Sequence, residues 1–136
     1  MIQLVYWIFL AAAFGFIEAV FFHTADYYKL KDFNRKYSDI HVFFTLQRAI
    51  TFISLFSDIR HAILLAIPCI MIFPFIHDGV YYDMRNNLDG NIYKRGFFDE
   101  PSITSTAKTR LSFKQRTWLA IGGLIIFSFL YTSRFY

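Results

Sequence analysis

Four runs of apolar residues alternate with polar segments along the chain. They cover residues 2–22, 40–57, 61–77 and 117–133. As a helix, the first of these runs rises over roughly 30 Å, which is about the thickness of the hydrocarbon core of a bilayer. We therefore predict an all-α fold, a polytopic bundle of about four transmembrane helices, which forms a single domain over residues 1–136.

Small residues and prolines inside these runs predict how the helices pack. Ala11, Gly15 and Ala19 recur every four positions, and this spacing allows a neighbouring helix to approach closely in lipid. Pro68 and Pro74 each remove a backbone donor from the third run, so we expect that helix to be kinked.

The basic residues predict the orientation of the spans. Four Lys and Arg residues lie between the first and second runs, and seven lie in the long segment 78–116 before the fourth run. With four spans these two segments share one side of the membrane, and the other side keeps only Arg60 and Arg134. Because cytoplasmic loops carry an excess of Lys and Arg, we expect both segments to be cytoplasmic and both termini to lie outside.

The composition agrees with a membrane location. Of the 136 residues, 56% are hydrophobic and 18% are charged, whereas soluble domains have roughly 45–50% apolar and about 25% charged residues. We expect a bacterial inner membrane or the membrane of a lipid-containing virion. The basic residues flank the predicted spans instead of forming one face, so no nucleic-acid partner is expected. Cys69 is the only cysteine, which excludes an internal disulfide and a cysteine-rich metal site.

Two ionisable residues lie well inside the predicted spans. Glu18 is about one helical turn from the cytoplasmic end of the first span, and Arg48 is about two turns from that end of the second. A charged side chain in a bilayer is costly, and pairing removes much of the cost. We therefore predict a Glu18–Arg48 ion pair that holds the helices in register, with a proton or ligand site as the alternative.

The second run also has a polar half on a helical wheel. Thr45, Gln47, Arg48 and Thr51 fall within this half, although apolar residues interrupt it. We expect the polar half to face the interior of the bundle or a water-filled crevice, and a helix that lies along the membrane surface is the alternative.

A second group of candidate residues lies at the predicted cytoplasmic ends of the spans. His23 leaves the first span, His41 enters the second, and His77 and Asp78 leave the third. Imidazole beside carboxylate can bind zinc, iron or manganese or relay protons, so we predict a polar site at this level. The spacing matches no metal-binding motif, and plain contact with water and lipid headgroups is the alternative.

No catalytic template accompanies these residues. The chain has no glycine-rich phosphate loop and no nucleophile elbow, and the sequence identifies no cofactor. We therefore expect a non-enzymatic accessory subunit that packs with other membrane proteins or with copies of itself. The alternatives are a membrane enzyme or redox component with a metal at His23, His41, His77 and Asp78, and a proton or ion conductor that uses Glu18 and Arg48.

Overall fold

The computed structural model describes residues 2–27, 33–89, 96–98 and 111–133. These residues form four α-helices, and no strand occurs among them. The helices are α1 (Ile2–Tyr27), α2 (Phe33–Ser54), α3 (Ile59–Asp89) and α4 (Phe113–Thr132). The prediction of an all-α fold is confirmed.

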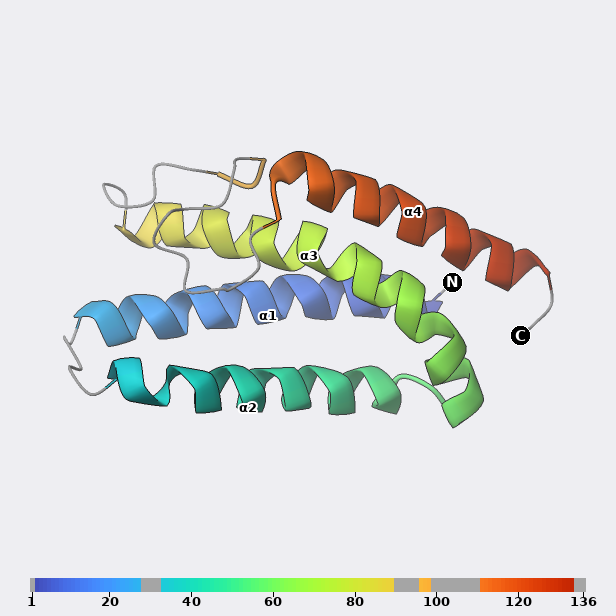
Figure 1. The fold of residues 1–136 in the computed structure, drawn as a ribbon, viewed down its shortest axis with the longest axis horizontal. Coiled ribbons are helices and arrows are strands. Elements are labelled where there is room, and N and C mark those ends of the chain that lie inside the picture. Colours follow the sequence, from blue (N-terminus) through green and yellow to red (C-terminus); the bar gives the residue numbers. More distant parts are fainter. Residues whose placement is uncertain (1, 28–32, 90–95, 99–110, 134–136) are drawn as a thin grey trace.

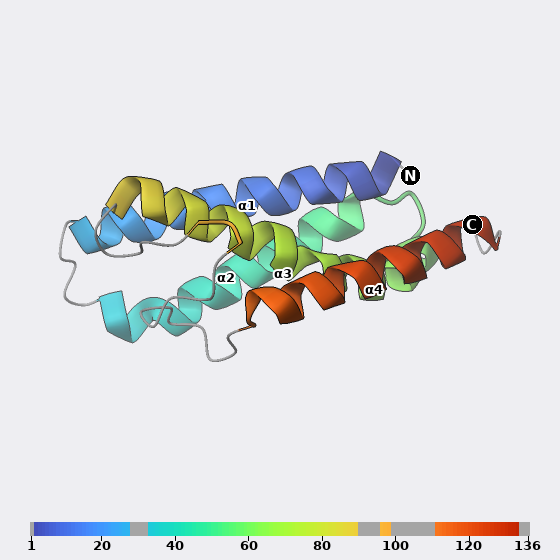
Figure 2. The same cartoon turned by 90° about the horizontal axis from the view of Figure 1, so that it is seen from above.

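The helix α3 lies at the centre of the bundle (Figure 1). The helices α1 and α4 each pack closely along α3, whereas α2 makes few close backbone contacts with any other helix, and these are mainly with α3. Successive helices run in opposite directions, so that α1 and α3 are parallel to each other and antiparallel to α2 and α4 (Figure 2).

Small residues permit the close approach of α1 and α3. Ala11, Gly15 and Ala19 are all buried in the structure. A Cβ atom on Gly15 would collide with the backbone carbonyl of His77, so at this position only glycine fits between the two helices. The stripe of these three small residues, spaced four positions apart, is therefore the face through which α1 packs on α3.

Two prolines in α3 accompany its bend, and a glycine of α4 packs closely against it. Pro68 and Pro74 both lie inside this helix, which bends along its length in Figure 1. A Cβ atom on Gly123 of α4 would lie 2.7 Å from the carbonyl oxygen of Pro68, which shows how closely the two backbones pack. Near the bend, the indole nitrogen of Trp7 donates a 3.0 Å hydrogen bond to the carbonyl oxygen of Cys69. This bond ties α1 to α3 beside the carbonyl of Ile70, from which Pro74 removes the normal helical donor.

Side-chain caps begin two of the helices. Asp58 precedes α3, and its carboxylate accepts a 2.9 Å hydrogen bond from the backbone N–H of Arg60. Ser112 and Gln115 form a reciprocal capping box at the start of α4. These caps satisfy backbone donors that would otherwise lack a helical partner.

Two helices are long and apolar enough to cross a membrane, namely α1 over Ile2–Ala25 and α3 over Ile59–Asp89. The helix α2 contains a shorter apolar stretch, Val42–Ser54. The count of four spans is therefore not confirmed by helix length and composition, and it stays a prediction.

The boundaries of the helices differ from the predicted apolar runs. The third helix does not end near residue 77 but continues to Asp89, so the predicted loop 78–116 begins as helix. The reason is that Pro74 and Gly79 are both tolerated inside this helix, so that helical structure continues although hydrophobicity ends at residue 77. At 1.5 Å per residue α3 is about 46 Å long, well above the roughly 30 Å of a hydrocarbon core.

Candidate functional site

Charged and polar side chains from three helices meet inside the bundle. Glu18 comes from α1, Arg48 from α2, and the neighbours His77 and Asp78 from α3. We call these four residues the polar cluster. Glu18 and His77 are buried, with 7% and 6% of their surfaces exposed. The cluster thus lies among apolar helices, where each charge requires a partner.

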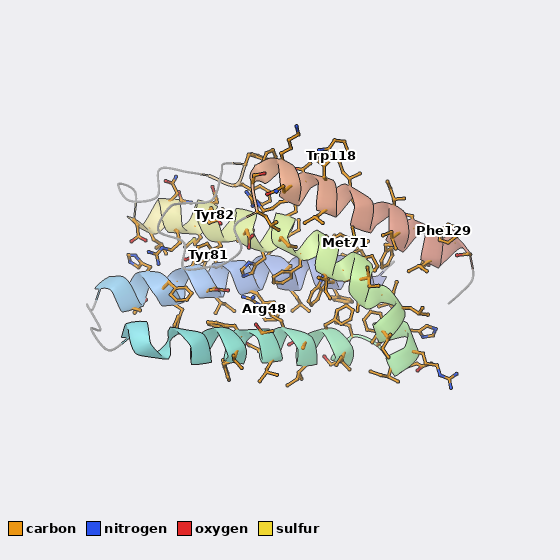
Figure 3. All side chains as sticks on the ribbon, viewed as in Figure 1. Arg48, Met71, Tyr81, Tyr82, Trp118 and Phe129 are labelled. Atoms are coloured by element: carbon orange, nitrogen blue, oxygen red, sulfur yellow. The ribbon has the colours of Figure 1, made fainter. Side chains whose placement is uncertain are left out.

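The ion pair expected between Glu18 and Arg48 is present in the structure. The Nη2 atom of Arg48 donates to Oε2 of Glu18. Figure 3 shows Arg48 on the side of α2 that faces α1, in agreement with this contact. The pair joins two helices whose backbones otherwise have few close contacts, so it holds α2 against the rest of the bundle.

His77 completes a triangle with this pair. Its Nε2 atom lies 3.0 Å from Oε2 of Glu18 and 2.9 Å from Nη2 of Arg48. On the other side of the ring, Nδ1 lies 2.8 Å from Oδ1 of Asp78. Both ring nitrogens are therefore within hydrogen-bond distance of charged groups.

Aromatic rings hold the imidazole of His77 in place. The ring of Phe73 stacks on it at a centroid distance of 4.7 Å, and that of Tyr81 lies nearly parallel to it at 6.5 Å. The guanidinium of Arg48 also lies over Phe73, 5.1 Å from the ring centroid. These contacts fix the plane of the imidazole, so that Nε2 remains directed at Glu18 and Arg48.

The predicted grouping of histidines is wrong for His23. The structure pairs His23 with Asp89 at the far end of α3, where Nδ1 and Oδ1 are 2.5 Å apart. The other carboxylate oxygen of Asp89 lies 2.7 Å from Nε of Arg85. This second network joins the ends of α1 and α3 and is separate from His77, because α3 continues beyond the predicted end of the span. The side chain of His41 lies outside the described residues.

Asp89, the partner of His23, was not predicted from the sequence, but it belongs to a simple pattern on α3. Phe73, His77, Tyr81, Arg85 and Asp89 recur every four positions on α3. Residues four apart lie on one helical face. This stripe could have been recognised in the sequence if the third helix had been continued past residue 77.

Two buried arginines were also missed. Arg85 and Arg116 are 1% and 0% exposed, although both were counted among the basic residues of a cytoplasmic loop. The guanidinium of Arg116 lies over the rings of Tyr82 and Phe113, at 5.3 and 5.9 Å from their centroids. These contacts join the end of α3 to the start of α4. Arg85 belongs to the four-residue repeat of α3 that runs from Phe73 to Asp89, whereas nothing in the local sequence distinguishes Arg116 from a solvent-exposed arginine.

The polar half of α2 does not face the interior as a unit. Arg48 points inward, but Thr45 and Gln47 are exposed. Among the described side chains of α2, only Phe44 and Phe52 are buried. The prediction of a polar inner face is therefore wrong except at Arg48, because aromatic side chains make the closest packing contacts of this helix.

An apolar groove of about 500 Å³ lies between α2 and α3. Arg48 and Thr45 are the polar residues of its lining. The apolar lining consists of Trp7, Ala49, Phe52, Ile53, Ile59, Ala62, Ile63, Ala66, Ile70, Phe73 and Pro74. Because this space separates α2 from α3, Arg48 is the side chain through which α2 reaches His77.

The described residues do not form a metal site. Among residues 2–27, 33–89, 96–98 and 111–133, no three His, Cys, Asp or Glu side chains are grouped so that they could hold a metal ion. The guanidinium of Arg48 is already paired with the carboxylate of Glu18, and a metal cation would have to displace the guanidinium. The cluster is thus better suited to hold a proton than a metal.

Comparison with known proteins gives no relative of this chain. No protein-family model matches it, and neither a curated protein nor a solved structure matches it.

Proposed function

We propose that this protein is a small multi-pass integral membrane protein, an accessory subunit that packs with other membrane proteins or with copies of itself. All four helices cross the bilayer in this proposal. The polar cluster then has a structural role, because it fixes the position of α2 relative to α1 and α3.

The observation that carries the proposal is the inverted distribution of polar and apolar side chains. Large apolar side chains are exposed on every helix, including Phe9 on α1, Ile50 on α2, Ile67 on α3 and Ile125 on α4, each 64–74% exposed. Trp118 likewise projects outward from α4 (Figure 3). In water an apolar surface of this extent would associate, whereas in a bilayer it contacts acyl chains at no cost.

Two further features support this reading. The two longest apolar helices are mainly exposed, with 39% and 28% of their most apolar segments buried, and this low burial supports a membrane location over a role as core helices of a soluble domain. Alternating helix directions also bring the last turns of α1 and α3 to the same end of the bundle (Figure 1). In this proposal the basic residues that follow these two helices in the sequence face the cytoplasm, and both termini lie outside.

Cysteine labelling in intact cells tests the orientation. A cysteine at Ser105, in the segment between α3 and α4, should not react with a membrane-impermeant maleimide added outside. A matched cysteine at Ser133, after α4, should react readily. The native Cys69 is buried and should not react with the maleimide. Labelling at Ser105 and not at Ser133 would reverse the topology.

Cross-linking in native membranes tests the accessory role. A short amine- or thiol-reactive linker should produce one defined species larger than the monomer, whose composition mass spectrometry identifies. A protein that stays monomeric at native abundance, in membranes and in mild detergent, would contradict the accessory role and leave only its membrane location.

The second candidate function is proton or ion conduction. It is favoured by the polar cluster itself, since ionisable groups inside membrane helices commonly serve transport. Proteoliposomes that contain the protein would take up protons under an imposed potential, and Glu18→Gln would abolish this flux. Flux equal to that of empty liposomes would exclude conduction by the protein alone.

A further inference from the structure

The Nε2 atom of His77 has two charged neighbours that make opposite demands on it. Arg48 carries only donors, and an ionised Glu18 carries only acceptors. Nε2 lies within hydrogen-bond distance of both. With a lone pair it accepts from Arg48, and with a proton it donates to Glu18. One nitrogen atom cannot do both at once.

The hydrogen bond of the other ring nitrogen, Nδ1, determines which nitrogen of His77 gains or loses a proton. Nδ1 faces the carboxylate of Asp78 at 2.8 Å and is a donor in either case. A neutral imidazole is thus held as the Nδ1–H form, and only Nε2 gains or loses a proton. The charges of the cluster total one negative unit when His77 is neutral and zero when it is an imidazolium.

The charged groups around His77 come from each of the three helices that meet at this site, namely α1 (Glu18), α2 (Arg48) and α3 itself (Asp78). Phe73 and Tyr81 flank the ring and keep its plane fixed in both protonation states. Stacking on aromatic rings also stabilises the imidazolium.

We propose that the polar cluster is a proton-binding site, with one exchangeable proton on Nε2 of His77, and that its occupancy controls the contact between α2 and α3. Without the proton, Arg48 bonds to both Glu18 and His77 and ties the three helices together. With the proton, His77 donates to Glu18, and Arg48 keeps Glu18 as its partner but loses His77. The proposal goes beyond the accessory role, because it holds whatever the partner of the protein is.

Loss of the Arg48–His77 bond affects α2 most, because this helix has few other contacts with α3. Phe44 and Phe52 are its buried side chains in the described part of the chain, and the apolar groove separates it from α3 beside Arg48. Loss of the Arg48–His77 bond therefore leaves α2 held to α3 mainly by apolar contacts and by the guanidinium of Arg48 over the ring of Phe73. Binding of a proton is in this way coupled to how firmly α2 is held.

Nuclear magnetic resonance of ¹⁵N-histidine-labelled protein in detergent micelles tests the proposal. As the pH falls from about 8 to about 5, the window in which imidazoles commonly titrate, the signal of His77 should pass from the Nδ1–H neutral form to the imidazolium. His77→Gln assigns this signal, and if that variant does not fold, His23→Gln, His41→Gln and His61→Gln assign it by elimination.

Two variants with opposite expected effects make the test specific. Glu18→Gln removes the acceptor charge, so the transition should move to lower pH by roughly one unit or more, while Arg48→Gln should move it to higher pH by a similar amount. Gln47→Ala, on the exposed side of α2 next to Arg48, is the matched control and should leave the transition unchanged.

A stability measurement gives an independent readout. By linkage, Arg48→Gln should destabilise the protein more above the transition than below it, because Arg48 bonds to His77 only when the imidazole is neutral. A purely structural ion pair would give a penalty independent of pH across this window. A single protonation form of His77 at all pH values, or a transition that neither variant moves, would overturn the proposal.

Discussion

Removal of one member of the Glu18–Arg48 pair should destabilise the bundle almost as much as removal of both. Each side chain is the charge partner of the other, and both are largely enclosed, with exposed side-chain fractions of 9% for Glu18 and 20% for Arg48. A single variant leaves a lone buried charge, whereas the double variant loses the interactions of both side chains but leaves no unpaired charge between them. A double-mutant cycle with Glu18→Gln and Arg48→Gln therefore measures this coupling.

The structure also predicts which single variant is worse. Without Arg48, Glu18 keeps the Nε2 atom of His77 at 3.0 Å as a partner that can carry a proton. Without Glu18, the only remaining neighbour of Arg48 in the triangle is His77, which must then stay neutral. Glu18→Gln should cost about 3 kcal/mol, at the lower end for breaking a buried pair, and Arg48→Gln about 2 kcal/mol because its partner is compensated.

The double variant should cost about 3 kcal/mol, not the sum of about 5 kcal/mol, which gives a coupling of about 2 kcal/mol. The free energy of unfolding is measured by reversible denaturation in mixed micelles at a fixed pH. Additive losses, within about 0.5 kcal/mol, would show that the two side chains act independently. A larger loss for Arg48→Gln than for Glu18→Gln would refute the compensating role of His77.

Three further substitutions test the packing of the helices. Gly15→Ala should cost about 1–3 kcal/mol of unfolding free energy, because the new Cβ meets backbone atoms of α3. Gly122→Ala is the control: its Cβ meets only the end of a flexible side chain, so it should be neutral or stabilise by up to about 1 kcal/mol. Equal losses of stability in thermal unfolding would contradict this prediction. Trp7→Phe removes an interhelical hydrogen bond and should cost about 1 kcal/mol, while Trp118→Phe at an exposed position should change stability by less than about 0.5 kcal/mol. Asp89→Asn removes the carboxylate shared by a histidine and an arginine and should cost about 1–3 kcal/mol, with faster hydrogen exchange at the end of α3; unchanged exchange there would show that this network does not hold the helix ends together.

Much of the fold follows from the sequence alone, because the dominant signal is local. Each apolar run is long enough to form a helix, and only a helix satisfies its own backbone groups in an apolar environment. The stripe of Ala11, Gly15 and Ala19 likewise indicates a close helix contact, since small side chains are the condition for it. The pairing of Glu18 with Arg48 follows from the cost of a lone charge inside an apolar span.

The tertiary structure decided the rest, because it depends on how far each helix continues and how it is rotated. Hydrophobicity falls at residue 77, but helical hydrogen bonding does not stop there, so α3 carries Asp89 to His23 and places Tyr81 beside His77. Arg85 is buried because α3 continues past residue 77, and Arg116 is buried because it lies in the first turn of α4. From hydrophobicity alone, both positions resemble those of loop residues. The triangle of Glu18, Arg48 and His77 requires polar side-chain atoms from three helices to lie about 3 Å apart. This depends on how each helix is rotated, and no periodicity in one helix specifies the rotation of its neighbours.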